Sequence, residues 1–358
     1  MQGCNLLGGA EFYVAIDNKG LWPNLILLPN GEIAAFIYNH PSHGYGSNSD
    51  LEMWISEDGG RFWQYRSTVS THAEEANAIR INHAVGLSPN GEIMALISGY
   101  HEGQKRPFLP VQCCRSLDNG KTWRRHLLPA LGEQVPYGRI LALTGDKWAC
   151  ALYGKTDGQQ PLRNVSIYES DNNGATWQKR SHLAENVSET FLMRRKDGIW
   201  MASGRTAVQE SFDRVLPHGA GERLFLSQDE GRTWDQGRLV SPQGQENAHL
   251  LELQDGRILY AFTSRIPGLF GVVLRLSADG GKTWSVTQPL ITMPATDWHK
   301  TDCGYPSSVQ LADGTIVTAY YFGPKCGNEP IPGAQGLPWH NRYHMGVARW
   351  KLSDWPQF

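Results

Sequence analysis

The sequence has no excess of either charge and no long apolar run. Its 358 residues include 33 Lys and Arg against 35 Asp and Glu, a formal net charge of −2, which gives no indication of a nucleic-acid partner. No stretch approaches the roughly 18 apolar residues that span a bilayer, so we expect no membrane partner. The first residues, MQGCNLLGGAEFYVAID, lack a basic region followed by an apolar run. As written, the sequence therefore indicates a cytoplasmic protein, or a periplasmic or secreted one if a signal peptide has been removed.

Cysteine is also scarce, and its spacing matches no metal site. The six cysteines are Cys4, Cys113, Cys114, Cys150, Cys303 and Cys326. Their distribution favours free thiols over a disulfide framework. Cys113 and Cys114 are adjacent and would point to opposite faces of a strand. Histidines four apart, His340 and His344, flank the start of a strand, which is not a metal-ligand arrangement. We expect neither a metal nor another cofactor.

What the sequence does contain is a repeated stretch of eight residues, Ser-x-Asp-x-Gly-x-Thr-Trp. Three copies match fully, at residues 116–123 (SLDNGKTW), 227–234 (SQDEGRTW) and 277–284 (SADGGKTW). Two copies have one substitution, at residues 56–63 (SEDGGRFW) and 170–177 (SDNNGATW). The starts of successive copies lie 60, 54, 57 and 50 residues apart. Repetition at this period indicates a repeat architecture.

Each copy has the chemistry of a tight turn between two strands. The Asp carboxylate accepts hydrogen bonds from backbone N–H groups in its own turn, and Gly supplies a left-handed backbone conformation. Thr and Trp then begin the next strand, with the indole over the turn. Five copies are too many for one active site, so we interpret these Asp residues as structural.

A second turn precedes each of these stretches and defines six units. It lies between two apolar runs and contains Asn-Gly, Asp-Gly or Gly-Asp, a strong hairpin signal. The six turns are at residues 29–31, 89–91, 145–146, 196–198, 254–256 and 312–314. Each unit then reads as four strands, and the early strand at residues 11–16 is placed to complete the sixth unit. The sequence predicts an all-β chain, a single six-bladed β-propeller over residues 1–358 with these Asp turns.

Polar and aromatic residues occur at one fixed offset from the hairpin turns. Nine residues before them stand Trp22, Asn82, Tyr137, Glu189, Asn247 and Tyr305. Near these positions are Arg80, His83, Arg139, His249 and Asp302, and seven to nine residues after the turns come His40, Tyr100, Arg205, Arg265 and Tyr321. The inner strands of a propeller begin at one mouth of the central channel, so these residues should surround an axial pocket.

With these repeats and this residue order, the whole chain resembles the sialidase (neuraminidase) superfamily, whose six-bladed propellers carry Asp-box repeats. The resemblance implies that Tyr305 is a nucleophile activated by Glu189, and that Arg205 and Arg265 bind a substrate carboxylate. A tyrosine hydroxyl has a pKa near about 10, so it needs a carboxylate to take its proton. Guanidinium groups suit carboxylates because they form paired hydrogen bonds.

The sequence departs from the family pattern at two places. Leu21-Trp22-Pro23 stands where the family has Arg-Ile-Pro, so the first arginine is absent. Arg80 or Arg139 could replace it. The loop expected to hold the acid/base aspartate reads YNHPSHG at residues 38–44 and has its first acid only at Asp50. The remaining candidates for proton donor are His43 in that loop and Asp302.

These residues predict an exo-acting glycoside hydrolase of the sialidase type. The substrate would be a terminal, anionic sugar, either sialic acid or a uronic acid, with Trp22 stacking on a sugar face and Asn82, His83, Tyr137, Asn247 and His40 as further binding residues. Long loops at residues 206–222 and 324–340 would wall the pocket. Two alternatives remain: a non-catalytic carbohydrate-binding propeller, and a polysaccharide lyase in which a Tyr and a His move protons at a uronic acid.

Overall fold

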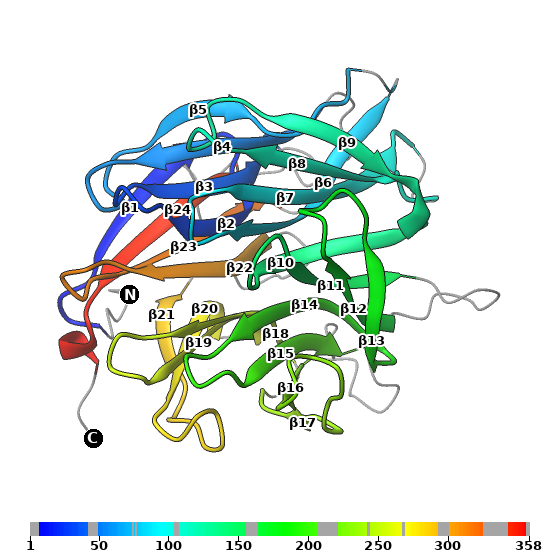
Figure 1. Cartoon of the computed structure of the whole chain (residues 1–358). Coiled ribbons are helices and arrows are strands. Elements are labelled where there is room, and N and C mark those ends of the chain that lie inside the picture. Colours follow the sequence, from blue (N-terminus) through cyan, green and yellow to red (C-terminus); the bar gives the residue numbers. More distant parts are fainter. Residues whose placement is uncertain are drawn as a thin grey trace.

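The structure is a computed structural model, and almost all of its regular structure is β-strand (Figure 1). It describes residues 7–41, 49–73, 75, 77–103, 107–154, 164–206, 221–241, 244–266, 269–292, 301–324 and 343–355, with only the backbone of Thr301 and Pro324. The helices of this part are two single 3-10 turns, η1 (Pro129–Leu131) and η3 (Leu352–Asp354). Neither has the length and apolar character that crossing a membrane requires. The prediction of an all-β chain is confirmed.

Three four-stranded sheets follow the chain in simple order, each strand pairing with the next. The first contains β2 (Leu21–Leu27), β3 (Ile33–Tyr38), β4 (Leu51–Ser56) and β5 (Gln64–Thr68). The second contains β14 (Val187–Arg194), β15 (Trp200–Thr206), β16 (Glu222–Ser227) and β17 (Arg238–Leu239). The third contains β18 (Gln245–Glu252), β19 (Ile258–Ile266), β20 (Leu269–Ser277) and β21 (Gln288–Thr292).

The fourth sheet joins the two ends of the sequence. It contains β22 (Thr301–Gln310), β23 (Ile316–Pro324), β24 (His344–Trp350) and, beside β24, the early strand β1 (Glu11–Asp17). The pairing of β1 with β24 is antiparallel, and Figure 1 shows the blue and red strands next to each other. The prediction that this early strand completes the last unit is confirmed.

The remaining eight strands form one sheet, which differs from the two separate blades that the sequence predicted. It contains β6 (Ala78–Leu87), β7 (Ile93–His101), β8 (Val111–Ser116), β9 (Arg124–Leu128), β10 (Gln134–Ala142), β11 (Trp148–Gly154), β12 (Asn164–Ser170) and β13 (Gln178–Ala184). The order is β13-β12-β11-β10-β6-β7-β8-β9. Its two halves meet through a short parallel pairing, Gly138 with Ala84 and Arg139 with Val85. Gly86 allows this approach because a Cβ there would lie 2.4 Å from the Ile140 carbonyl oxygen.

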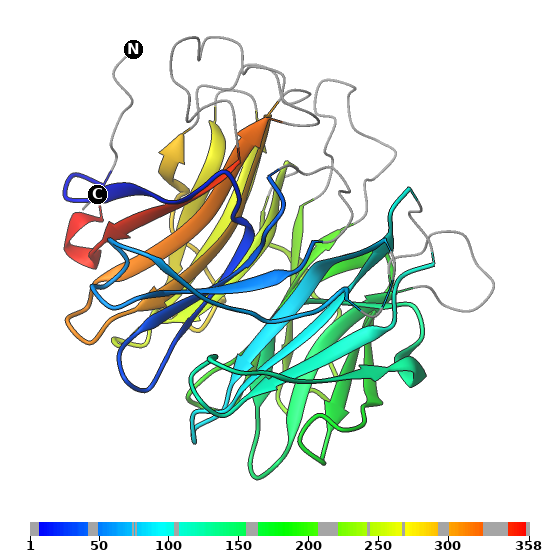
Figure 2. The same cartoon turned by 90° about the horizontal axis from the view of Figure 1, so that it is seen from above.

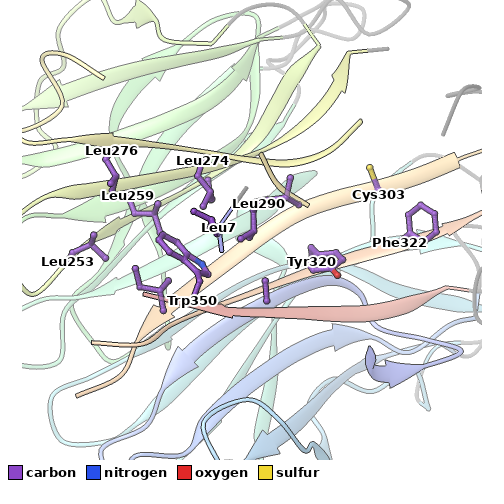
Figure 3. Packing of buried hydrophobic residues seen from close by; sticks show 14 of the residues in the cluster. Leu7, Leu253, Leu259, Leu274, Leu276, Leu290, Cys303, Tyr320, Phe322 and Trp350 are labelled. Carbon is purple, nitrogen blue, oxygen red and sulfur yellow. The ribbon is translucent and has the colours of Figure 1, made fainter. Parts of the chain in front are cut away.

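The sets of four strands have a propeller-like arrangement (Figure 2). Apolar side chains fill the space between each set and the next. Between the last two sheets, Leu259 and Leu274 face Tyr320 and Trp350 (Figure 3). A further cluster, which contains Ile16, packs the last sheet against the first. Cys113 and Cys114 belong to different clusters, as predicted for neighbours on a strand. The four described cysteines are buried free thiols, and Cys4 and Cys326 lie outside the described residues.

The repeated turns have the predicted hydrogen bonds. At residues 116–123 the Asp118 carboxylate accepts from the Thr122 backbone N–H at 3.0 Å and from the Ser116 hydroxyl at 2.7 Å, and Gly120 N–H donates to the Ser116 hydroxyl at 2.9 Å. The indole does more than cover the turn, because Trp123 Nε1 donates to the Ser67 hydroxyl of the preceding sheet at 2.9 Å. Trp234 Nε1 donates in the same way to the Ser181 hydroxyl at 3.2 Å, so the turns at residues 116–123 and 227–234 also hold neighbouring sheets together.

Candidate active site

The innermost strand of every four-stranded set is irregular at the predicted ring position. The antiparallel pairing of β2, β6, β10, β14, β18 and β22 with the following strand shifts register there. Trp22, Asn247 and Tyr305 have positive φ of 51°, 58° and 47°. Residues other than Gly, Asn and Asp rarely adopt this backbone conformation. Bulges re-aim side chains, and strained backbone is concentrated at functional sites, so these irregularities mark a candidate site at this end of the inner strands.

Tyr305 and Glu189 are in direct contact at this end. The Tyr305 hydroxyl donates to Glu189 Oε1 at 2.6 Å. The other carboxylate oxygen, Oε2, accepts from Arg205 Nη1 at 2.7 Å and from Asn247 Nδ2 at 2.8 Å. Glu189, on β14, thus contacts residues from three other strands. Burial raises the pKa of Tyr305 well above its usual value, and the Glu189 carboxylate raises it further, so Tyr305 holds its proton and points it at Glu189.

Arg205 and Arg265 converge on a carboxylate that the sequence analysis did not identify. Glu246 is fully buried. Its Oε2 lies 2.9 Å from Arg205 Nε, and its Oε1 forms an ion pair with Arg265 Nη1. Arg265 Nη2 also lies 3.6 Å from Asp302 Oδ1. Glu246 directly precedes Asn247, and strict alternation along a strand would have turned it away from the ring.

Asp302 lies at the edge of this cluster and is surrounded by donors. The Tyr321 hydroxyl donates to Asp302 Oδ1 at 2.7 Å, and the Tyr343 hydroxyl donates to Oδ2 at 3.1 Å. Only 4 % of Asp302 is exposed. Tyr343 is a second residue that the offset from the hairpin turns did not reveal, because it precedes β24 rather than an inner strand.

Aromatic rings form one wall around Tyr305. The ring centroids of Trp22, Tyr137 and Tyr321 lie 6.3, 6.1 and 5.7 Å from that of Tyr305. Trp22 also packs on Tyr38 at 5.5 Å. Trp22 and Tyr305 are each partly exposed. Such a wall can pack against the C–H face of a sugar ring.

Arg80 and Arg139 do not join the two site arginines. Arg80 is buried, with Nη2 2.6 Å from Glu75 Oε2 and Nη1 donating to the Pro110 carbonyl at 2.8 Å. Arg139 follows Tyr137 by two residues, and its Nη2 donates to the Leu25 carbonyl at 2.8 Å. Burial lowers the pKa of Arg139 to about 10.

The remaining predicted binding residues have different positions. His83 is buried, which lowers its pKa to about 4, so it is uncharged near neutral pH. His40 stacks on Tyr38 with a centroid distance of 6.0 Å. Asn82 lies at the bulge of β6, where its buried Oδ1 has no hydrogen-bond partner among the described residues. His43 and most of the two long loops lie outside the described residues.

A histidine–aspartate pair forms next to the loop that follows β3. His72 Nδ1 lies 2.6 Å from Asp50 Oδ2, and the Ser70 hydroxyl donates to Asp50 Oδ1 at 2.8 Å. The two residues are 22 positions apart, so only the path of the chain after β5 reveals the pair. No group of three or more His, Cys, Asp or Glu within the described ranges is arranged to hold a metal ion.

The comparisons with known proteins assign a family. The family described as BNR repeat-like domain matches residues 46–319, more than half of the chain. The chain belongs to this family, within the sialidase superfamily. It is 22% identical over 362 residues to a sialidase of Micromonospora viridifaciens, which covers 88% of this chain and 53% of the relative. A sialidase of Paraclostridium sordellii is 25% identical over 222 residues, 53% of each protein.

This BNR repeat-like chain spans about half the length of the sialidases that it matches. Among solved structures it resembles a Dyadobacter fermentans protein of unknown function, with a TM-score of 0.73, 21% identity and coverage of 95% of this chain and 98% of the other. A Hadza microbial sialidase gives a TM-score of 0.69 at 17% identity, covering 94% of this chain and 66% of that one. At such identities the structural likeness shows the fold alone.

Proposed function

We propose that this protein is a glycoside hydrolase that removes a terminal sugar, with Tyr305 as nucleophile and Glu189 as its base. The hydrogen bond of 2.6 Å between the Tyr305 hydroxyl and Glu189 Oε1 carries the proposal. A neutral tyrosine is a weak nucleophile, and a carboxylate in contact with its proton can activate it. The sialidase relatives support the reaction class.

The reaction has two steps. The Tyr305 oxygen attacks the anomeric carbon while its proton passes to Glu189, and the glycosidic bond breaks as the leaving oxygen takes a proton from a donor. Water then attacks the same carbon and passes a proton to the deprotonated donor, while the tyrosine oxygen leaves the carbon and takes its proton back from Glu189. Arg205 and Asn247 hold Glu189 Oε2, which leaves Oε1 directed at the Tyr305 hydroxyl.

We assign proton donation to His43 rather than to Asp302. Asp302 accepts hydrogen bonds from two tyrosine hydroxyls and lies near the Arg265 cation. Such surroundings stabilise an ionised carboxylate, which has no proton to give. Asp302 then serves to hold Arg265. Imidazole titrates near neutral pH and suits the donor role.

We also infer that the fold is a closed propeller of six blades in one domain. The eight-stranded sheet divides into two sets of four, and among the described residues these sets pair only through the two-residue parallel contact of β6 with β10. Apolar clusters lie between every consecutive pair of sets, including the last and the first. This arrangement would place the six bulged inner strands around one axis.

Chromogenic glycosides of neutral sugars, uronic acids and sialic acid test the proposed reaction. We expect Tyr305→Phe to lose at least about a thousandfold in kcat while sugar binding, followed by tryptophan fluorescence, is retained. Tyr65→Phe, at an exposed position remote from the site, is the matched control. Unchanged turnover in Tyr305→Phe would remove the proposal. Binding without any turnover by the wild type would favour a carbohydrate-binding protein, and an unsaturated product absorbing in the ultraviolet would identify a lyase.

A further inference from the structure

The two arginines that the resemblance assigns to a substrate carboxylate are already paired with the protein's own acids. Arg205 contacts Glu189 at 2.7 Å and Glu246 at 2.9 Å. Arg265 contacts Glu246 and lies 3.6 Å from Asp302. A single buried side chain, Glu246, bridges both guanidinium groups.

The charges of the described site residues do not favour an anion. Two guanidinium groups stand against three carboxylates, those of Glu189, Glu246 and Asp302. Including Arg139, which lies on the same strand as Tyr137, would bring the net charge of these described residues only to zero. Arg80 adds nothing because Glu75 neutralises it.

The pairing of Glu246 is also hard to displace. A fully buried carboxylate is costly unless it keeps its partners, because it cannot regain water. Burial alone would lower the pKa of Arg205, but the Glu246 and Glu189 carboxylates raise it well above its usual value. Burial would likewise lower the pKa of Arg265, but the Glu246 and Asp302 carboxylates raise it above its usual value. Within the described residues, the two cations are thus stabilised by internal acids that outnumber them.

We propose that this site binds an uncharged sugar, and that Glu246 is the residue that excludes carboxylate-bearing sugars such as sialic and uronic acids. The proposal refines the substrate of the proposed hydrolase and rests on the same pocket. A guanidinium has five N–H donors, so a neutralised arginine can still donate to sugar hydroxyls. The partly exposed rings of Trp22 and Tyr137 beside Tyr305 offer apolar surface to the sugar ring.

Binding of matched sugar pairs tests this inference without any requirement for turnover. The pairs are methyl glucoside with methyl glucuronide, methyl galactoside with methyl galacturonide, and the methyl ester of sialic acid with sialic acid, each titrated against tryptophan fluorescence. We expect the wild type to bind no carboxylate member more tightly than its uncharged partner. Glu246→Gln keeps the size of the side chain and removes its charge, and we expect it to raise affinity for carboxylate members at least tenfold relative to their partners.

Asp255→Asn is the matched control, because Asp255 is an exposed acid in the turn between β18 and β19 of the same sheet. It should leave the affinity ratios unchanged. Wild-type preference for any carboxylate member would overturn the inference, and so would a folded Glu246→Gln protein with no tenfold gain. The wild-type comparison holds even if that variant does not fold. Failure of the hydrolase itself would appear separately, as unchanged turnover in Tyr305→Phe.

Discussion

At the scale of single residues, the carboxyl group of Glu222, beside Arg205, has an environment that favours its protonated form. Glu222 pairs with Arg205 across β15 and β16 and is fully buried. The Ser203 hydroxyl donates to its Oε2 at 2.7 Å, while its Oε1 has no partner among the described residues. Burial raises the pKa of Glu222 to about 8, and the nearby Glu246 carboxylate adds to the rise. A neutral Glu222 leaves Glu189, Glu246 and Asp302 as the carboxylates that face the two arginines.

This raised pKa predicts a pH dependence of stability. In the unfolded chain Glu222 ionises near pH 4.5, whereas the folded protein keeps the proton until about pH 8. Between these values the folded state binds more protons, so the free energy of unfolding falls as pH rises, by at most about 1.4 kcal/mol per pH unit from this group. Its stabilising contribution is complete below pH 4.5 and is lost on the way to pH 8.

Glu222→Gln resembles the protonated side chain and should remove this slope. We expect the variant to gain stability relative to the wild type steadily from pH 5 to pH 8, measured by urea denaturation at each pH. Glu230→Gln, at an exposed position, controls for the loss of one charge and should follow the wild type. Parallel pH profiles of Glu222→Gln and the wild type would show that Glu222 is ionised in the folded protein.

At the scale of elements, local signals in the sequence identified the turns and the irregular position on each inner strand, whereas pairings between distant elements could not be predicted. Asn-Gly, Asp-Gly and the Ser-x-Asp turns act within a few residues, so the hairpins and the ring position of Glu189 and Tyr305 follow from the sequence. The role of Glu246 depends on a bulge and on the positive φ of Asn247, which change the direction of its side chain. Arg80 was predicted to line the pocket but binds Glu75, because the path of the loop before β6 is not encoded in a local pattern.

The repeated turns are the elements whose contribution to stability is easiest to measure. Asp118 accepts four hydrogen bonds within its turn, from Ser116, Lys121 and Thr122. Asp118→Ala leaves these donors without their acceptor and should lower the free energy of unfolding by roughly 1–3 kcal/mol. Hydrolysis at low temperature should be unchanged, because the turn is structural.

The third repeated turn, at residues 170–177, provides the matched control for this substitution. There Asn172 Oδ1 accepts from Thr176 N–H at 2.9 Å, and Asn172 Nδ2 donates to the Thr176 hydroxyl at 2.8 Å. Asp118→Asn can therefore keep the turn and should cost less than about 1 kcal/mol. Equal losses in the Ala and Asn variants, measured by denaturant unfolding, would mean that the negative charge rather than the hydrogen bonding stabilises the turn.

At the scale of the whole molecule, stability depends on joining the start of the sequence to its end. Ile16 of β1 is 3 % exposed and packs with Leu25 of the first sheet and Val317 and Val347 of the last. Val14 lies on the same strand and is 46 % exposed. The two residues differ in burial while sharing the pairing of β1 with β24, so they separate the effect of packing from that of the strand itself.

Ile16→Ala should lower the free energy of unfolding by about 2–4 kcal/mol, because it leaves a cavity between the first and last sheets. Val14→Ala, which empties no buried space, should cost well under about 1 kcal/mol. Because the sheets pack in a closed series, opening one contact weakens all of them, and we expect tryptophan fluorescence and sugar hydrolysis to be lost in a single transition. Equal stability of the two variants would show that β1 does not close the ring. Two separate transitions in Ile16→Ala would show instead that the sheets unfold independently of one another.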